Sequence, residues 1–252
     1  MQEITSRKNP MLQHLKKLGT DKTYRTETGE FLCDGPTLYR EAVAAGMEIT
    51  FFITSKRDFM VQSTHPAVWV PDDVLASISP QKSPQGVLFA CKIPMHPPAK
   101  SPRTTLVLDG VQDPGNVGTL VRTALAFGAD QVILLRETAD VYNPKTIRAG
   151  MGAIFRQPIT RMTTSELADY LAENNLTMLG ANLAASSQPA TSPMPERVAI
   201  AIGSEGAGLS DEIQNLCDAT IYIPMRPGVE SLNAAVAGSV LMWERHRSIY
   251  KN

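Results

Sequence analysis

The chain has 252 residues, of which 43% are hydrophobic and 19% are charged. This composition is typical of a globular protein with a buried core, and it excludes a disordered or fibrous chain. The length exceeds that of most single domains, so two domains are expected. No apolar run approaches the roughly 20 residues of a membrane span, and the N-terminus lacks the apolar stretch of a signal peptide, which predicts a cytoplasmic protein.

The formal net charge of −1 is not typical of a nucleic-acid-binding protein. A local basic excess nevertheless occurs before residue 26, where Arg7, Lys8, Lys16, Lys17, Lys22 and Arg25 face only Glu3 and Asp21. This excess is either an RNA-binding surface or an ordinary solvated helix face. The cysteines and histidines are scattered without metal-ligand spacing, so no metal site is expected, and the cysteines are interpreted as buried thiols.

The first hundred residues alternate between helix and strand patterns. A helix is predicted from Pro10 to Gly19, because apolar residues recur there at helical spacing. The other predicted elements are helices at 37–45 and 72–79 and strands at 30–33, 49–54, 67–70 and 87–92. Prolines without apolar periodicity follow. They predict a linker at 95–103, which ends a first domain at 1–94.

The second domain, predicted at 104–252, begins with a strand, a helix and a second strand at 105–108, 117–127 and 131–135. A unit of this kind implies a parallel sheet with a right-handed crossover. The remaining predicted elements are helices at 165–173, 211–216 and 232–248 and strands at 176–180, 198–202 and 220–223. The predicted fold class is therefore α/β, with a parallel sheet in the larger domain.

Ligands collect at the carboxyl ends of parallel strands, so functional residues are expected in the loops there. In the first loop, Asn116 lies between glycines and is predicted to cap the following helix. Arg122 lies on the helix face opposite the apolar residues, so it need not belong to the core. It is either a solvated arginine or a functional one.

The second loop contains Gly203, Gly206 and Gly208, in the reverse order of the dinucleotide-binding glycine pattern. A nicotinamide site is therefore disfavoured. Glycines at a strand end allow a flat ligand to approach the backbone, and Glu205 lies among them. A simple tight turn explains the pattern equally well.

The third loop is made rigid by prolines and leads into the last helix. Ser231 is predicted to cap this helix, and Asn233 is placed in its first turn. The helix then carries a flank of small residues, which permits close packing either in a core or at a dimer interface. These residues are Ala234, Ala235, Ala237, Gly238 and Ser239.

The segments NVGTLVRTALAFG, IGSEGAGLS and IPMRPGVESLNAAVA resemble, in this order, the signature motifs of the SpoU/TrmH family of SPOUT-class RNA 2′-O-methyltransferases. The front half is similar to the L30e-like substrate-binding extension of the longer family members. That similarity rests on ITSRKNPMLQHLKKL, YRTETGEFLCDGPTLYREAVAAG and KSPQGVLFA. Asp34 departs from the family's usual glutamate.

The resemblance implies a trefoil-knot domain that binds S-adenosylmethionine and needs no metal. By position, the cofactor pocket would be lined by Ala181, Gly203, Ile223 and Leu232. Arg122 would activate the ribose 2′-hydroxyl, with Asn116, Glu205, Ser231 and Asn233 orienting it and the nucleotide. Because arginine is normally too basic to lose its proton, we favour a role in binding the hydroxyl and phosphate over a literal base.

The resemblance also implies a homodimer whose interface includes the last helix, with Trp243, Val236 and Val240 as candidates. Packing of these residues within one subunit is the alternative. The expected partner is RNA, with ribosomal RNA favoured over transfer RNA. The rival interpretations are a catalytically silent RNA-binding protein and a nicotinamide-dependent enzyme.

Overall fold

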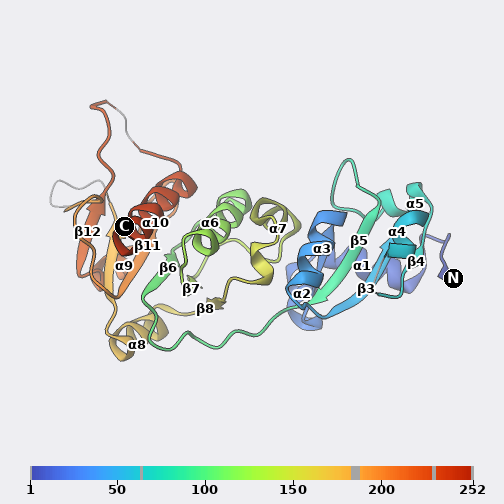
Figure 1. The fold of residues 1–252 in the computed structure, drawn as a ribbon, viewed down its shortest axis with the longest axis horizontal. Helices are drawn as coiled ribbons and strands as arrows, with labels where there is room; N and C mark the ends of the chain where they lie inside the picture. Colours follow the sequence, from blue (N-terminus) through green and yellow to red (C-terminus); the bar gives the residue numbers. More distant parts are fainter. Residues whose placement is uncertain (1, 63–64, 183–187, 229–230, 251–252) are drawn as a thin grey trace. The chain divides into compact units, whose positions relative to one another are not determined.

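The structure is a computed structural model that describes residues 2–62, 65–182, 188–228 and 231–250. The chain forms two compact units (Figure 1). Unit 1 comprises Met1–Met95 and Asp140–Phe155, and unit 2 comprises His96–Ala139 and Arg156–Asn252. Residues 140–155, which the sequence analysis placed in the second domain, thus pack with the first unit.

Unit 1 contains a five-stranded mixed sheet with the order β1-β4-β3-β5-β2. Strand β5 pairs antiparallel with both β3 and β2, whereas β1, β4 and β3 run parallel. The strands are β1 (Gln2–Glu3), β2 (Glu30–Asp34), β3 (Ile49–Thr54), β4 (Val68–Trp69) and β5 (Val87–Lys92). The helices are α1 (Pro10–Thr20), α2 (Lys22–Thr28), α3 (Pro36–Ala44), α4 (Arg57–Gln62), α5 (Asp72–Ala76) and α7 (Pro144–Gly150).

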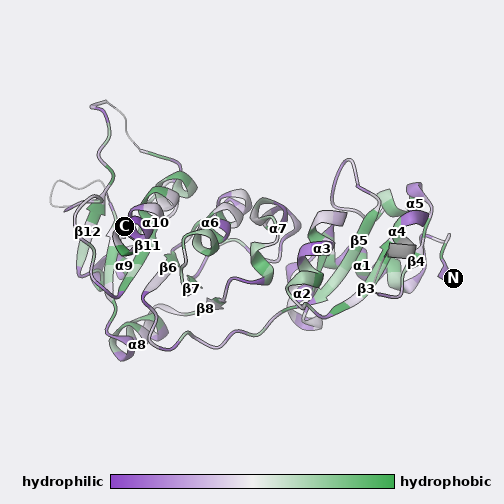
Figure 2. Ribbon diagram, in the orientation of Figure 1, coloured by the Kyte–Doolittle hydropathy of each residue, from purple (hydrophilic) through white to green (hydrophobic). Residues whose placement is uncertain are grey.

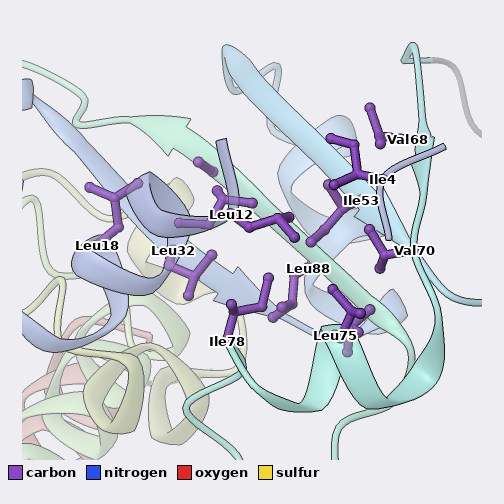
Figure 3. Packing of buried hydrophobic residues seen from close by; sticks show 13 residues of the cluster. Ile4, Leu12, Leu18, Leu32, Ile53, Val68, Val70, Leu75, Ile78 and Leu88 are labelled. Carbon is purple, nitrogen blue, oxygen red and sulfur yellow. The ribbon is translucent and has the colours of Figure 1, made fainter. Parts of the chain in front are cut away.

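One core cluster of unit 1 lies between α1 and the sheet. Asn9 caps α1 by accepting the Met11 amide at 2.9 Å, and Pro10 occupies the first turn, where its missing amide proton costs nothing. Leucines every third residue then put one helix face in contact with β2 and β5; Figure 3 shows Leu12, Leu32 and Leu88 among the clustered side chains. Full burial of each leucine stabilises the fold by roughly 1.5–3 kcal/mol.

Residues 140–155 join unit 1 through a buried ion pair and aromatic contacts. Arg25 is only 3% exposed, pairs with Asp140 at 2.7 Å and donates to the Leu18 carbonyl at 2.6 Å. The Phe31 ring lies 4.9 Å from that of Tyr142. Arg25 therefore does not belong to a solvated basic face, contrary to one interpretation of the N-terminal charges.

Unit 2 contains a seven-stranded sheet with the order β10-β12-β9-β11-β6-β7-β8, and every pairing in it is parallel. The strands are β6 (Thr104–Leu108), β7 (Gln131–Leu134), β8 (Ile159–Arg161), β9 (Thr177–Ala181), β10 (Gln188–Pro189), β11 (Val198–Ile202) and β12 (Ala219–Tyr222). The α-helices are α6 (Pro114–Ala126), α8 (Thr164–Asn174), α9 (Asp211–Leu216) and α10 (Ala234–Ile249), and a short 3-10 helix, Ala153–Phe155, belongs to unit 1.

Central strands β6 and β11 are buried along their whole length, which explains their continuous apolar sequence. In Figure 2 the apolar residues of the strands in both sheets are coloured green. The predicted α/β fold class with a parallel sheet is confirmed. Among the described residues, no helix is long and apolar enough to cross a membrane.

The small-residue flank of α10 packs inside unit 2. Gly238 lies so close to α6 that an added Cβ would collide with the Leu120 side chain, and it would also lie 3.3 Å from Ile202. Ala234 and Ala235 are buried as well. Core packing, and not a dimer interface, therefore explains these positions of the small-residue flank. Other residues of α10 remain exposed.

Candidate active site

The candidate site forms where β6, β9, β11 and β12 end, because parallel strands bring their carboxyl ends to one edge of the sheet. The loop after β11 folds back on itself. Ser204 and Gly208 exchange backbone hydrogen bonds of 2.9 and 3.0 Å. A Cβ at Gly203 would collide with the backbone of Gly208, and Gly208 itself has a φ of 70°, so this turn requires glycine at both positions.

This folded loop forms one wall of a cavity of about 400 Å³. The size lies within the range of small-molecule sites. All four predicted cofactor residues, Ala181, Gly203, Ile223 and Leu232, line it. Its lining mixes backbone and apolar groups with a few polar side chains, which suits a flat ligand with polar ends. The additional lining residues include Asn182, Ile202, Gln214, Tyr222, Met225 and Leu241.

Three of the predicted catalytic residues form a hydrogen-bonded chain at the mouth of this cavity. Asn116 donates its Nδ2 to Glu205 Oε1 at 2.6 Å, and Asn233 donates its Nδ2 to Asn116 Oδ1 at 3.1 Å. Glu205 also lines the cavity. The carboxylate, which only accepts, fixes the orientation of the first amide and thereby of the second. We refer to Glu205, Asn116 and Asn233 as the amide chain.

Two predicted helix caps were wrong, and the difference matters for the site. Helix α6 is capped by Asp113, whose side chain accepts the Asn116 amide at 2.9 Å. Helix α10 is capped by Asn233, whose Oδ1 accepts from Ala235 and Val236. Asn116 is thus free to contact Glu205. Ser231 is exposed and lines the cavity, and it does not cap α10.

Arg122 lies apart from the other four predicted catalytic residues. It is exposed on α6, does not line the cavity, and makes no hydrogen bond or ion pair with any described residue. An unpaired guanidinium keeps all its donors available for an external anion or hydroxyl. The structure therefore brings together Asn116, Glu205, Ser231 and Asn233 but not Arg122.

The sequence analysis missed Asp109, a buried carboxylate directly after β6. Its Oδ2 accepts the Ser210 amide at 2.7 Å, and its own amide donates to Ile202 O at 2.9 Å. An acidic residue following an apolar strand was the available signal. Cys217, which is only partly buried and not fully buried as predicted, lies against Gly180, and this burial raises the pKa of its thiol to about 11. In the described ranges, no cluster of three potential metal ligands occurs.

Comparison with known proteins identifies the class to which this fold and site belong. Residues 103–243 match the SpoU rRNA methylase family, and residues 9–89 match the MRM3-like substrate-binding domain. The chain belongs to the SpoU rRNA methylase family, which confirms the predicted membership.

Individual relatives extend over nearly the whole chain. A protein of Bacillus subtilis (strain 168), named 23S rRNA (guanosine(2553)-2′-O)-methyltransferase RlmP, is 32% identical, with 96% of this chain and 98% of that protein covered. The crystal structure of an AdoMet-bound rRNA methyltransferase from Sinorhizobium meliloti has a TM-score of 0.87 at 30% identity, covering 99% and 98% of the two chains. That of the SpoU methyltransferase AviRb from Streptomyces viridochromogenes, in complex with AdoMet, has a TM-score of 0.87 at 25% identity, covering 96% and 98%.

Proposed function

We propose that this protein transfers a methyl group from S-adenosylmethionine to a ribose 2′-hydroxyl of RNA, with ribosomal RNA as the substrate. The observation that carries the proposal is the cavity at the sheet edge together with the amide chain at its mouth. The named relatives support the same reaction, because one acts on 23S rRNA and two were crystallised with the cofactor.

The cavity residues fit S-adenosylmethionine. Glycines and apolar side chains allow a flat adenine to lie against the backbone, and a Cβ at Gly203 would disrupt the wall that does this. When bound, the cofactor supplies the methyl group as a sulfonium electrophile. The residues assigned to hold it are Ala181, Gly203, Ile223 and Leu232.

The amide chain and Ser231 position the acceptor nucleotide, and Arg122 activates its hydroxyl. Methyl transfer requires the ribose oxygen in line with the methyl group, so correct placement supplies much of the rate. The amide groups offer both donors and acceptors to a ribose. A guanidinium donating to the hydroxyl and its neighbouring phosphate favours the ionised oxygen, which makes it more nucleophilic.

We further propose that the protein is a homodimer formed through α10. Val236 and Trp243 of this helix are 49% and 47% exposed. They line a groove of about 510 Å³ with Phe127 and Val240, and Asn116 and Asn233 lie in the same groove. A second copy would cover this apolar surface. This groove lies beside the amide chain, so a partner subunit bound there would complete the site. Its Arg122 would then reach the amide chain, which Arg122 of the same subunit does not contact.

The dimer is tested with Val236→Asp, which places a charge in the groove. We expect light scattering to show a monomer and methyl transfer to be lost, while Met95→Asp, a change at an exposed position outside α10, leaves both unchanged. A monomeric wild-type protein would contradict the dimer without affecting the proposed reaction.

The reaction and its substrate are tested by mapping 2′-O-methyl groups in total RNA from cells with and without the protein. We expect one ribosomal RNA site to disappear and to return when purified protein and S-adenosylmethionine are added. Loss of a transfer RNA site instead would correct the substrate. Binding of RNA without binding of S-adenosylmethionine in calorimetry would favour the catalytically silent RNA-binding protein.

A further inference from the structure

The loop that carries Glu205 is fixed at two points, and both anchors come from the segment after β6. At its tip, Glu205 accepts from Asn116 at 2.6 Å. At its base, the Ser210 amide donates to Asp109 at 2.7 Å. Between these points, residues 203–209 all line the cavity. The position of the cavity wall therefore depends on side chains that lie about a hundred residues earlier in the sequence.

We infer that Asp109 is a positioning residue that holds the S-adenosylmethionine-binding wall by its bond to the Ser210 amide. This inference rests on the proposed cofactor site. Asp109 does not line the cavity, so it acts through the loop and not by touching the ligand. With 4% exposure, it is screened from water, and a charged acceptor then gives a stronger hydrogen bond than a neutral one.

No other described group accepts a hydrogen bond from the Ser210 amide. Ser210 occupies the cap position of α9, but its side chain makes no capping bond, and its buried hydroxyl has no hydrogen-bond partner among the described residues. Gln214 Nε2 also holds the base of the loop by donating to the Leu209 carbonyl at 2.8 Å, but the Ser210 amide at the start of α9 relies on Asp109. Without the Asp109 carboxylate, the Ser210 amide would lack a hydrogen-bond acceptor, which costs free energy. The loop could avoid this cost only by moving.

The backbone on both sides of Asp109 is itself held in place by Thr138. The next residue, Gly110, has a φ of 68° and donates its amide to Thr138 Oγ1 at 3.1 Å. Thr138 in turn donates to the Leu108 carbonyl at 2.9 Å. The turn after β6 is therefore fixed, so the bond to Ser210 transmits a defined position to the loop.

The test compares Asp109→Ala and Asp109→Asn with a control at the opposite end of the same strand. Asp130 accepts the amides of Arg103 and Thr104 at 2.7 and 2.9 Å, so Asp130→Ala removes two bonds between a backbone amide and a carboxylate at the start of β6. Affinity for S-adenosylmethionine is measured by calorimetry on the whole protein. Hydrogen exchange of residues 203–210 and the melting temperature are measured in parallel.

For Asp109→Ala we expect the dissociation constant to rise about 10- to 100-fold, which is the loss expected for one charged hydrogen bond. The loop amides should exchange faster. Asp109→Asn should fall between this variant and the wild type, because its amide oxygen still accepts but carries no charge. At saturating cofactor, its kcat should recover, since the tip of the loop keeps its bond to Asn116.

Wild-type affinity and exchange in Asp109→Ala would overturn the inference, as would an equal loss of affinity in Asp130→Ala. If Asp109→Ala does not fold, Asp109→Asn decides: a raised dissociation constant that Asp130→Asn lacks supports the inference, and an unchanged one refutes it. A wild-type protein that does not bind S-adenosylmethionine would refute the proposed function instead.

Discussion

The two units organise their polar residues in different ways. In unit 1 the sheet is mixed, so strand ends of both directions occur at each edge, and charged groups pair with each other: Arg25 with Asp140, and Lys92 with Glu30. In unit 2 all strands are parallel, so loops from four strands meet at one edge, and the segments after β6, β11 and β12 hydrogen-bond to each other. The comparison shows that a parallel sheet concentrates residues for chemistry, whereas the mixed sheet of unit 1 uses its charges for packing.

Three arginines show that burial, and not the unit in which the residue lies, decides whether an arginine has a structural role. Arg25 in unit 1 and Arg245 in unit 2 are 3% and 2% exposed, and each is satisfied by several acceptors. Arg122 is exposed and has no partner among the described residues. A buried arginine must be paired to be stable, whereas an unpaired exposed one is available to a substrate. The first two are therefore structural, and the third is the candidate for catalysis.

The largest effect is expected for Arg122→Ala. We expect kcat for RNA methylation to fall about 10²- to 10⁴-fold, the range for a residue that assists proton removal. Binding of S-adenosylmethionine should not change, because Arg122 does not line the cavity. Arg136→Ala, at an exposed position paired with Glu212, serves as control. Wild-type turnover in Arg122→Ala would exclude the role proposed for it.

Arg245→Ala should destabilise unit 2 most strongly. The side chain donates to Thr104 Oγ1 at 3.0 Å, to the carbonyls of Pro195 and Arg103 at 2.7 and 3.0 Å, and to that of Glu196. Its removal leaves the buried Thr104 hydroxyl and three partly buried carbonyls without their donor, so we expect a loss of about 4 kcal/mol in unfolding free energy. Urea denaturation measures this loss. A change within experimental error would show that water replaces the guanidinium easily.

Arg25→Ala makes the corresponding change in unit 1. It leaves the Asp140 carboxylate, whose side chain is 15% exposed, without its ion-pair partner. We expect a loss of about 3 kcal/mol in unfolding free energy. S-Adenosylmethionine affinity, measured by calorimetry, should stay unchanged because no cavity residue is affected. Weaker cofactor binding in this variant would break the proposed division of roles between the units.

The smallest effect concerns the partly buried thiol of Cys217. Burial raises the pKa of Cys217 from 9.0 to about 11, so the folded state holds the proton more tightly than the unfolded state. Its stabilising contribution is complete below pH 9 and is lost as the pH rises through about 11. Urea denaturation between pH 8 and pH 11 should show a shallower decline in Cys217→Ala than in the wild type. Equal declines would contradict the raised pKa.

Much of the fold could be predicted from local pattern. The strands β3, β5 and β11 match their predicted ranges, because a continuous apolar run bounded by turns indicates a buried strand. Helix α7 was missed, since Pro144–Gly150 is short and has little apolar periodicity. Its membership in unit 1 depends on contacts such as Phe31 with Tyr142, which no sequence period encodes.

The sequence by itself determined the α/β class, the three loops at the strand ends, and the family to which the motifs belong. Periodicity, glycine and proline act within a few residues, so they can be interpreted without a structure. Only the tertiary structure decided that Asn116 binds Glu205 instead of capping a helix, and that Asp109 holds the Ser210 amide. These contacts join residues 89 and 101 positions apart, and they form only after the parallel strands are ordered side by side.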